Sequence, residues 1–150
     1  MGSAATAAGI KGLGDVAPHV EAAAVEIGQK FGVTNIGGRA SSGHINGSDH
    51  YTGHAIDVMV YKDKTKGDAV MNYALSNWDR LGIKYVIWYH VYHPSPTKTE
   101  NYIGPNPHTD HVHISFNSKP GSGGPAVDTG SETSGPDLQG CLSKLIPGLG

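Results

Sequence analysis

Two short segments, more than fifty residues apart, each alternate apolar side chains with side chains that can bind a metal ion. In residues 55–61, a period of two places Asp57 on one strand face and only Ile and Val side chains on the other. In residues 111–116, the same period places His111 and His113 on one face, opposite an apolar one. A carboxylate among apolar residues in mid-strand is costly unless a charged group meets it. The two segments therefore predict a sheet that carries a cation site on one face.

Histidine is concentrated around these segments. Six of the nine histidines lie in two short stretches: His44, His50, His54, His108, His111 and His113. Among the residues of these stretches, His50, Asp57 and His113 supply two imidazoles and one carboxylate. Catalytic zinc uses such a three-ligand set and keeps a fourth position for water. We interpret these three residues as zinc ligands; the alternative is that Asp57 pairs with a structural arginine or caps a turn.

Three further side chains could do chemistry beside such an ion. Asp110 lies three residues before the last of these ligands and could act as the base on a metal-bound water. His111 could stabilise the developing oxyanion or assist as an acid. Arg39 could hold a substrate carboxylate or carbonyl, and a solvated surface arginine is an equally good interpretation.

Hydrophobic periodicity predicts two helices, over residues 16–31 and 68–81. Short β-branched and aromatic runs predict strands over residues 33–36, 55–61, 84–91 and 111–116. The stretch 94–107 contains several prolines and a glycine, and we expect it to be a loop.

A length of 150 residues is sufficient for one domain with a hydrophobic core. Glycine and proline are abundant, with 22 and 9 residues, and the excess sits at the two ends. We therefore expect a flexible N-terminal segment over residues 1–14 and a folded domain carrying the zinc site over residues 15–117. A Gly/Ser/Pro-rich linker over residues 118–136 and a short amphipathic tail over residues 137–150 should follow.

The composition argues against several classes of partner. The net charge is −2 with dispersed Lys and Arg, so we expect no nucleic-acid or membrane-surface partner. The single cysteine, Cys141, excludes an intramolecular disulfide and a cysteine-based zinc site. No apolar run approaches the roughly 18–20 residues that span a bilayer. The first residues lack the basic and apolar regions of a signal peptide.

The spacing of the candidate residues resembles a known superfamily of zinc peptidases. The pattern Ser-x-His-x-x-Gly-x-Ala-x-Asp over residues 48–57 is followed by Asp-His-x-His over residues 110–113. Both resemble the superfamily that joins lysostaphin-type peptidases, D-Ala-D-Ala metallopeptidases and the hedgehog signalling domain. The runs at residues 67–88 and 110–116 look like small secreted or phage-encoded cell-wall hydrolase domains of actinobacterial type. In this chain Val112 stands where that group usually has an aromatic residue.

This resemblance implies an α+β fold, with a small, mainly antiparallel sheet flanked by helices and a zinc site in a groove on the sheet. It implies that the three ligands named above bind Zn²⁺. It places Asp110 at the position of the catalytic acid, where an aspartate is similar to the cell-wall L-alanyl-D-glutamate endopeptidases. By the same resemblance, His111 corresponds to the non-ligating member of the histidine pair in lysostaphin-type peptidases. Arg39 corresponds to the arginine that orients the substrate in the D-Ala-D-Ala branch.

The leading hypothesis is a zinc-dependent peptidoglycan peptidase that hydrolyses an amide bond in the stem peptide or cross-link of the bacterial cell wall. We expect a phage lysin or a virion-associated module of a larger phage protein, monomeric as this chain. A catalytically silent zinc module that binds cell wall or protein is the alternative. A purely structural zinc would need a fourth ligand, from His54 or His108, and His54 has the wrong strand parity. We interpret His90 and His93 as polar residues at the rim of the site or as groups that support the metal ligands, rather than as ligands themselves.

Overall fold

The structure is a computed structural model that describes residues 3–127. Over these residues the chain forms four α-helices, one 3-10 helix and a six-stranded sheet in which all neighbouring strands run antiparallel. In spatial order the strands are β1 (Ile36–Gly37), β2 (Ala55–Met59), β6 (His111–Phe116), β3 (Ile83–Trp88), β4 (Val91–Ser95) and β5 (Lys98–Asn101). The α+β class and the antiparallel sheet expected from the sequence are confirmed.

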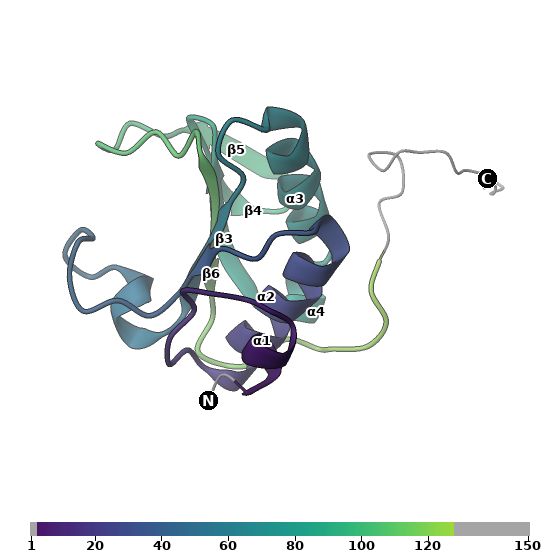
Figure 1. Ribbon diagram of the computed structural model, residues 1–150. Coiled ribbons are helices and arrows are strands. Elements are labelled where there is room, and N and C mark those ends of the chain that lie inside the picture. Colours follow the sequence, from purple (N-terminus) through teal and green to yellow (C-terminus); the bar gives the residue numbers. More distant parts are fainter. Residues whose placement is uncertain (1–2, 128–150) are drawn as a thin grey trace, which may run out of the picture.

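The helices and the irregular segments lie on opposite faces of the sheet (Figure 1). One face is covered by α1 (Ser3–Ala7), α2 (Pro18–Phe31), α3 (Lys64–Ser76) and α4 (Trp78–Leu81). The segment that contains the 3-10 helix η1 (Asp49–Thr52) and the green segment before β6 lie on the other face. No helix within residues 3–127 is long and apolar enough to cross a membrane.

Strand register separates an apolar face from a polar one. Val58 is the cross-strand partner of both Ile36 and Val112, and all three side chains are fully buried. Asp57 is the partner of His113, one position along, and therefore projects from the opposite face. The predicted alternation in both segments is confirmed, and the apolar face packs under the helices as the core.

Helix α2 follows the predicted pattern. It begins at Pro18, whose fixed φ suits a first helical turn. It ends at Gly32, which adopts a left-handed φ of 68°. Val20, Ala24 and Ile27 are completely buried, so the apolar stripe covers the sheet as expected.

The helix predicted over residues 68–81 begins earlier and is interrupted. The Asp63 side chain accepts a hydrogen bond from the backbone N–H of Lys66 at 3.0 Å, which starts α3 at Lys64. Asn77 leaves the helical conformation, with φ −115°, and its side-chain amide donates to the carbonyl four residues earlier. The sequence pattern is continuous across Asn77, so the break could not be read from periodicity.

Strands β4 and β5 form a β-hairpin in part of the predicted loop over residues 94–107. A second turn joins β3 to β4. Tyr89 and His90 both have positive φ, 52° and 69°, and form a two-residue turn between β3 and β4. Left-handed conformations at both central positions are typical of type I′ hairpin turns, which usually contain Asn and Gly. Because those residues are absent here, the turn gave no sequence signal, and the strand predicted to reach residue 91 ends at Trp88.

Contrary to the prediction for residues 1–14, the described part of this segment packs on the domain. The side chains of Ala5, Ile10 and Leu13 are buried in the core. Lys11 forms a parallel bridge with Asn35, which extends the edge of the sheet beside β1. The glycines between these residues provide the turns, while three apolar side chains provide enough burial to fix the segment.

The beginning of the predicted linker also has defined contacts. The backbone N–H groups of Ser122 and Gly123 donate to carbonyls of α4, at 3.1 and 3.0 Å. Asn77 binds both backbone groups of Val127, at 2.9 and 2.8 Å. Residues 118–127 therefore form a strap along α4. The rest of the predicted linker and the tail over residues 137–150 lie outside the described residues.

Candidate metal centre

A pocket of about 320 Å³ opens on the face of the sheet opposite the four α-helices. Asp57 and five of the nine histidines line it: His44, His50, His108, His111 and His113. They come from the loop before η1, from η1, from β2, from the segment that leads into β6, and from β6 itself. The predicted concentration of histidine from distant segments at one place is therefore present in the fold.

The three predicted zinc ligands meet at the carboxylate of Asp57. His50 Nε2 lies 3.2 Å from Asp57 Oδ2, and His113 Nδ1 lies 3.0 Å from Asp57 Oδ1. The register of β2 and β6 places Asp57 directly opposite His113. His50 lies on η1. The Ser48 hydroxyl caps this helix and accepts a hydrogen bond from the backbone N–H of His50 at 3.2 Å. Sequence reasoning found all three residues.

The remaining ring nitrogen of each of the two histidines has its own partner. His50 Nδ1 donates to the backbone carbonyl of Gly38 at 2.7 Å, and His113 Nε2 lies 2.8 Å from the Ser115 hydroxyl. Such contacts fix ring orientation and leave the opposite nitrogen free for a metal ion. His50 Nε2 is buried and makes no hydrogen bond within the described part of the chain. An orphaned nitrogen beside a carboxylate is a pair of donors that a divalent cation such as zinc can bind.

Electrostatics at the site favour an ionised carboxylate. Burial opposes ionisation of Asp57, but the adjacent imidazoles of His113 and His50 hold its pKa well below the ordinary value. Burial also lowers the pKa of His113, against the influence of Asp57. The pKa of His50 is raised because its contacts with Asp57 outweigh its burial.

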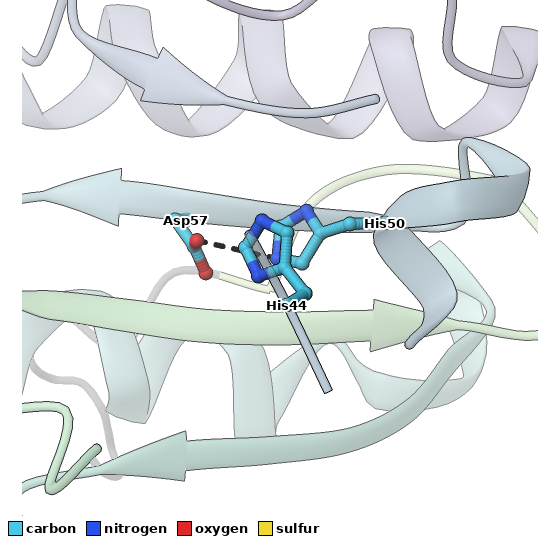
Figure 2. Close-up of side chains that lie close together, drawn as sticks. All are labelled: His44, His50 and Asp57. Atoms are coloured by element: carbon cyan, nitrogen blue, oxygen red, sulfur yellow. Dashed lines mark ion pairs between the residues drawn. The ribbon is translucent and has the colours of Figure 1, made fainter. Parts of the chain in front are cut away.

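His44 was not selected individually from the sequence, yet it lies at this site. Figure 2 shows its imidazole beside that of His50, with the Asp57 carboxylate facing both. The His44 and His50 rings are stacked, with centroids 4.1 Å apart. Ligand atoms of His44, His50 and Asp57 all lie within 4.8 Å of one another, so these three side chains could also hold a metal ion. The abundance of histidine in this loop was the only available sequence signal.

His111 lies in the pocket, but Asp110 does not line it. His111 Nε2 is 3.7 Å from Asp57 Oδ1, and its Nδ1 is 2.7 Å from Asp110 Oδ1. The Asp110 side chain is 61% exposed and lines a separate hollow. Asp110 is therefore placed to act on His111 rather than directly on a metal-bound water.

Arg39 is not brought to the pocket either. Its side chain is exposed and lines a neighbouring hollow with Ala40, Ser41 and Tyr51. An arginine here can meet only a substrate that extends beyond the pocket.

Of the two candidates for a fourth ligand, only His108 lines the pocket. It is buried, with its ring 4.7 Å from that of His111, and its Nδ1 makes no hydrogen bond within residues 3–127. Burial, together with nearby His111 and His113, lowers the pKa of His108 to about 4. His54 is outside the pocket, and its Nδ1 lies 3.1 Å from the Thr52 hydroxyl.

The fold and the site together define an α+β protein with a histidine-rich candidate metal centre on the open face of its sheet. The family model described as VldE, C-terminal domain, matches residues 12–113, which is more than half of the chain. The chain therefore belongs to this family. The matched range includes Asp57 and all five histidines of the pocket. No curated protein and no solved structure matches the chain.

Proposed function

We propose that this chain is a zinc-dependent peptidase that hydrolyses an amide bond in the stem peptide or cross-link of bacterial peptidoglycan. The observation that carries the proposal is the Asp57 carboxylate held between His50 Nε2 and His113 Nδ1 in an open pocket. A two-histidine, one-carboxylate set with room beside it is typical of catalytic rather than structural zinc. The cell-wall substrate follows from the resemblance of residues 48–57 and 110–113 to wall peptidases.

The chemistry supplied by zinc in such a site is a bound water with a pKa near 7 and a polarised scissile carbonyl. His50, Asp57 and His113 would hold the ion. His111 is the group that we assign to proton transfer, because its Nε2 faces Asp57 inside the pocket. It would take the proton of the attacking water and pass it to the leaving amine.

Asp110 has a positioning role in this proposal. Its carboxylate lies 2.7 Å from His111 Nδ1, which fixes the ring and leaves Nε2 directed into the pocket. An imidazolium formed during proton transfer would be stabilised by this neighbour. Asp110 thus acts through His111 instead of serving as the base itself.

The pocket walls suit a peptide. Apolar and aromatic side chains line it on both sides of the histidines, from Ile45 on the loop before η1 to Tyr102 and Pro105 before β6. Tyr85 stacks on His113, with ring centroids 5.5 Å apart, and closes the floor. A phage lysin or a virion-associated module is the setting that we propose for the activity, again from the resemblance.

A catalytically silent zinc module that binds cell wall or protein is the second candidate. It is favoured by the positions of Asp110 and Arg39, because two of the three predicted catalytic side chains lie outside the pocket.

Metal content and lysis, measured together, separate the two candidates. The measurements are bound zinc by elemental analysis and turbidity loss of purified cell walls, for wild type, His111→Ala and the control His54→Ala. A peptidase predicts full zinc content in all three and lysis lost only in His111→Ala. Wild type that holds zinc but lyses no wall of any chemotype favours the binding module. Wild type without zinc would refute both. Mass analysis of the released muropeptides would then identify the bond that is cut.

A further inference from the structure

The loop before η1 brings a histidine to the mouth of the candidate metal centre. The His44 ring is stacked on His50, with an interplanar angle of 17°, and its ligand atom lies within 4.8 Å of those of His50 and Asp57 (Figure 2). We propose that His44 is a fourth, displaceable protein ligand that closes the metal site until a substrate arrives. This inference rests on the proposed function, because it requires an ion held by His50, Asp57 and His113.

The position of His44 is fixed by one tyrosine. The Tyr51 hydroxyl accepts the backbone N–H of His44 at 2.9 Å and donates to the backbone carbonyl of His44 at 2.6 Å. A single side chain thus satisfies both backbone groups of the residue. Because Tyr51 belongs to η1, the same short helix that delivers His50 also anchors the loop that carries His44.

The distances allow His44 to reach a shared ion. Zinc–nitrogen bonds of about 2.0–2.1 Å place the ligand atoms of a tetrahedral site about 3.4 Å apart. Because the ligand atoms lie within 4.8 Å of one another, the gap that remains to be closed is at most about 1.4 Å. In the stacked geometry the His44 ring must also rotate, so that a nitrogen lone pair points toward the ion.

The loop that carries His44 lies outside the core. Residues 41–47 are exposed, and Gly43 and Gly47, on either side of His44, have positive φ values of 92° and 80°, which glycine adopts without strain. His50, in contrast, is 1% exposed and fixed by Gly38. His50 is thus held by burial, whereas His44 is exposed and is held through the Tyr51 hydroxyl, which suits a ligand that a substrate carbonyl can replace.

The variant His44→Phe separates a ligand from a stacking partner, because phenylalanine retains the stacked ring and lacks the nitrogen. We would measure zinc affinity by competition with a chromophoric chelator, for wild type, His44→Ala, His44→Phe and the control His54→Ala. Both His44 variants should bind zinc at least about tenfold more weakly. His54→Ala should bind like wild type, and Tyr51→Phe should fall between, because its loop loses the anchor.

Cobalt substitution gives a second readout that does not depend on activity. The visible absorption of the Co²⁺ protein should change equally in His44→Ala and His44→Phe, as expected when a nitrogen ligand is lost. Acetohydroxamate, a small oxygen chelator, should bring wild type and both variants to the same final spectrum, because it displaces His44.

The outcomes separate failure of this inference from failure of the proposed function. Wild-type affinity and spectrum in His44→Phe would show that the ring only stacks, and would overturn the inference while leaving the metal centre intact. A wild-type spectrum that acetohydroxamate leaves unchanged, while both His44 variants respond to it, would show a permanent ligand and also overturn it. If the wild-type protein binds neither zinc nor Co²⁺, the metal centre is refuted, and the proposed function is refuted with it.

Discussion

Asp57 and His113 are direct cross-strand partners on β2 and β6, and their side chains meet with 3.0 Å between Oδ1 and Nδ1. The backbone register alone therefore brings together two residues that are far apart in the sequence. A slip of one residue would turn one of the two side chains toward the helices and abolish the pair. The buried apolar partners on the opposite face, such as Val58 and Val112, stabilise the correct register.

Asp57→Asn should abolish zinc binding while leaving the fold intact, because the amide keeps the shape and loses the charge. Zinc at 100 times its Kd stabilises a one-site protein by about 2.7 kcal/mol, which is several degrees in Tm. We expect this thermal shift in wild type and none in Asp57→Asn, by differential scanning fluorimetry with and without chelator. An equal shift in both proteins would show that the ion binds elsewhere.

In the metal-free protein, His108 should make stability fall on acidification. Its pKa is lowered to about 4, against about 6.5 in the unfolded chain, so the unfolded state takes up a proton first. The free energy of unfolding should therefore decrease as the pH falls from about 6.5 to about 4, by up to about 3 kcal/mol from this residue. His108→Phe should remove that part of the slope in urea unfolding series. Equal slopes in the two proteins would contradict the assignment.

Gly67→Ala should destabilise the domain, because α3 approaches β3 closely at this residue. A Cβ atom there would lie 2.1 Å from the Trp88 ring, which is itself buried. Overpacking of this kind typically costs about 1–3 kcal/mol. The exposed position Asn72 on the same helix provides a matched control, and Asn72→Ala should leave the free energy of unfolding unchanged or slightly raised. Urea titration of both variants measures the difference.

Asn77→Ala should release the strap over residues 118–127 and lower stability. The buried Asn77 side chain binds both backbone groups of Val127 and accepts the Nε–H of Arg80 at 2.9 Å. Its removal deletes these hydrogen bonds, each of which typically contributes about 0.5–1.5 kcal/mol. Amide hydrogen exchange should rise at Ser122, Gly123 and Val127. Unchanged protection at these three amides would show that the strap is held by other contacts.

Much of the fold was predictable from local patterns. β2, β6 and α2 follow alternation or helical spacing, because each buries one face against the core. The end of β3 was misplaced because the β3–β4 turn is made by Tyr89 and His90 in left-handed conformations, which their residue types do not indicate. The glycine content of the N-terminal segment predicts flexibility, whereas the side chains of Ile10 and Leu13 are buried in the core.

The candidate site was predictable as far as strand register determines it. His50, Asp57 and His113 were identified because strand parity and a known spacing coincide. His44 could not be selected, because its place depends on the tertiary contact with Tyr51. Asp110 was given a direct role because it is close to His113 in sequence, whereas it precedes β6 and points to the outer nitrogen of His111.

Because the four α-helices all cover one side of the sheet, the side with the histidines is bordered by η1 and by two irregular segments, residues 38–48 and 102–110. Their length and composition can change without repacking the hydrophobic interior. New ligand recognition could therefore be engineered by exchanging these two irregular segments, while the helical side continues to supply the hydrophobic core.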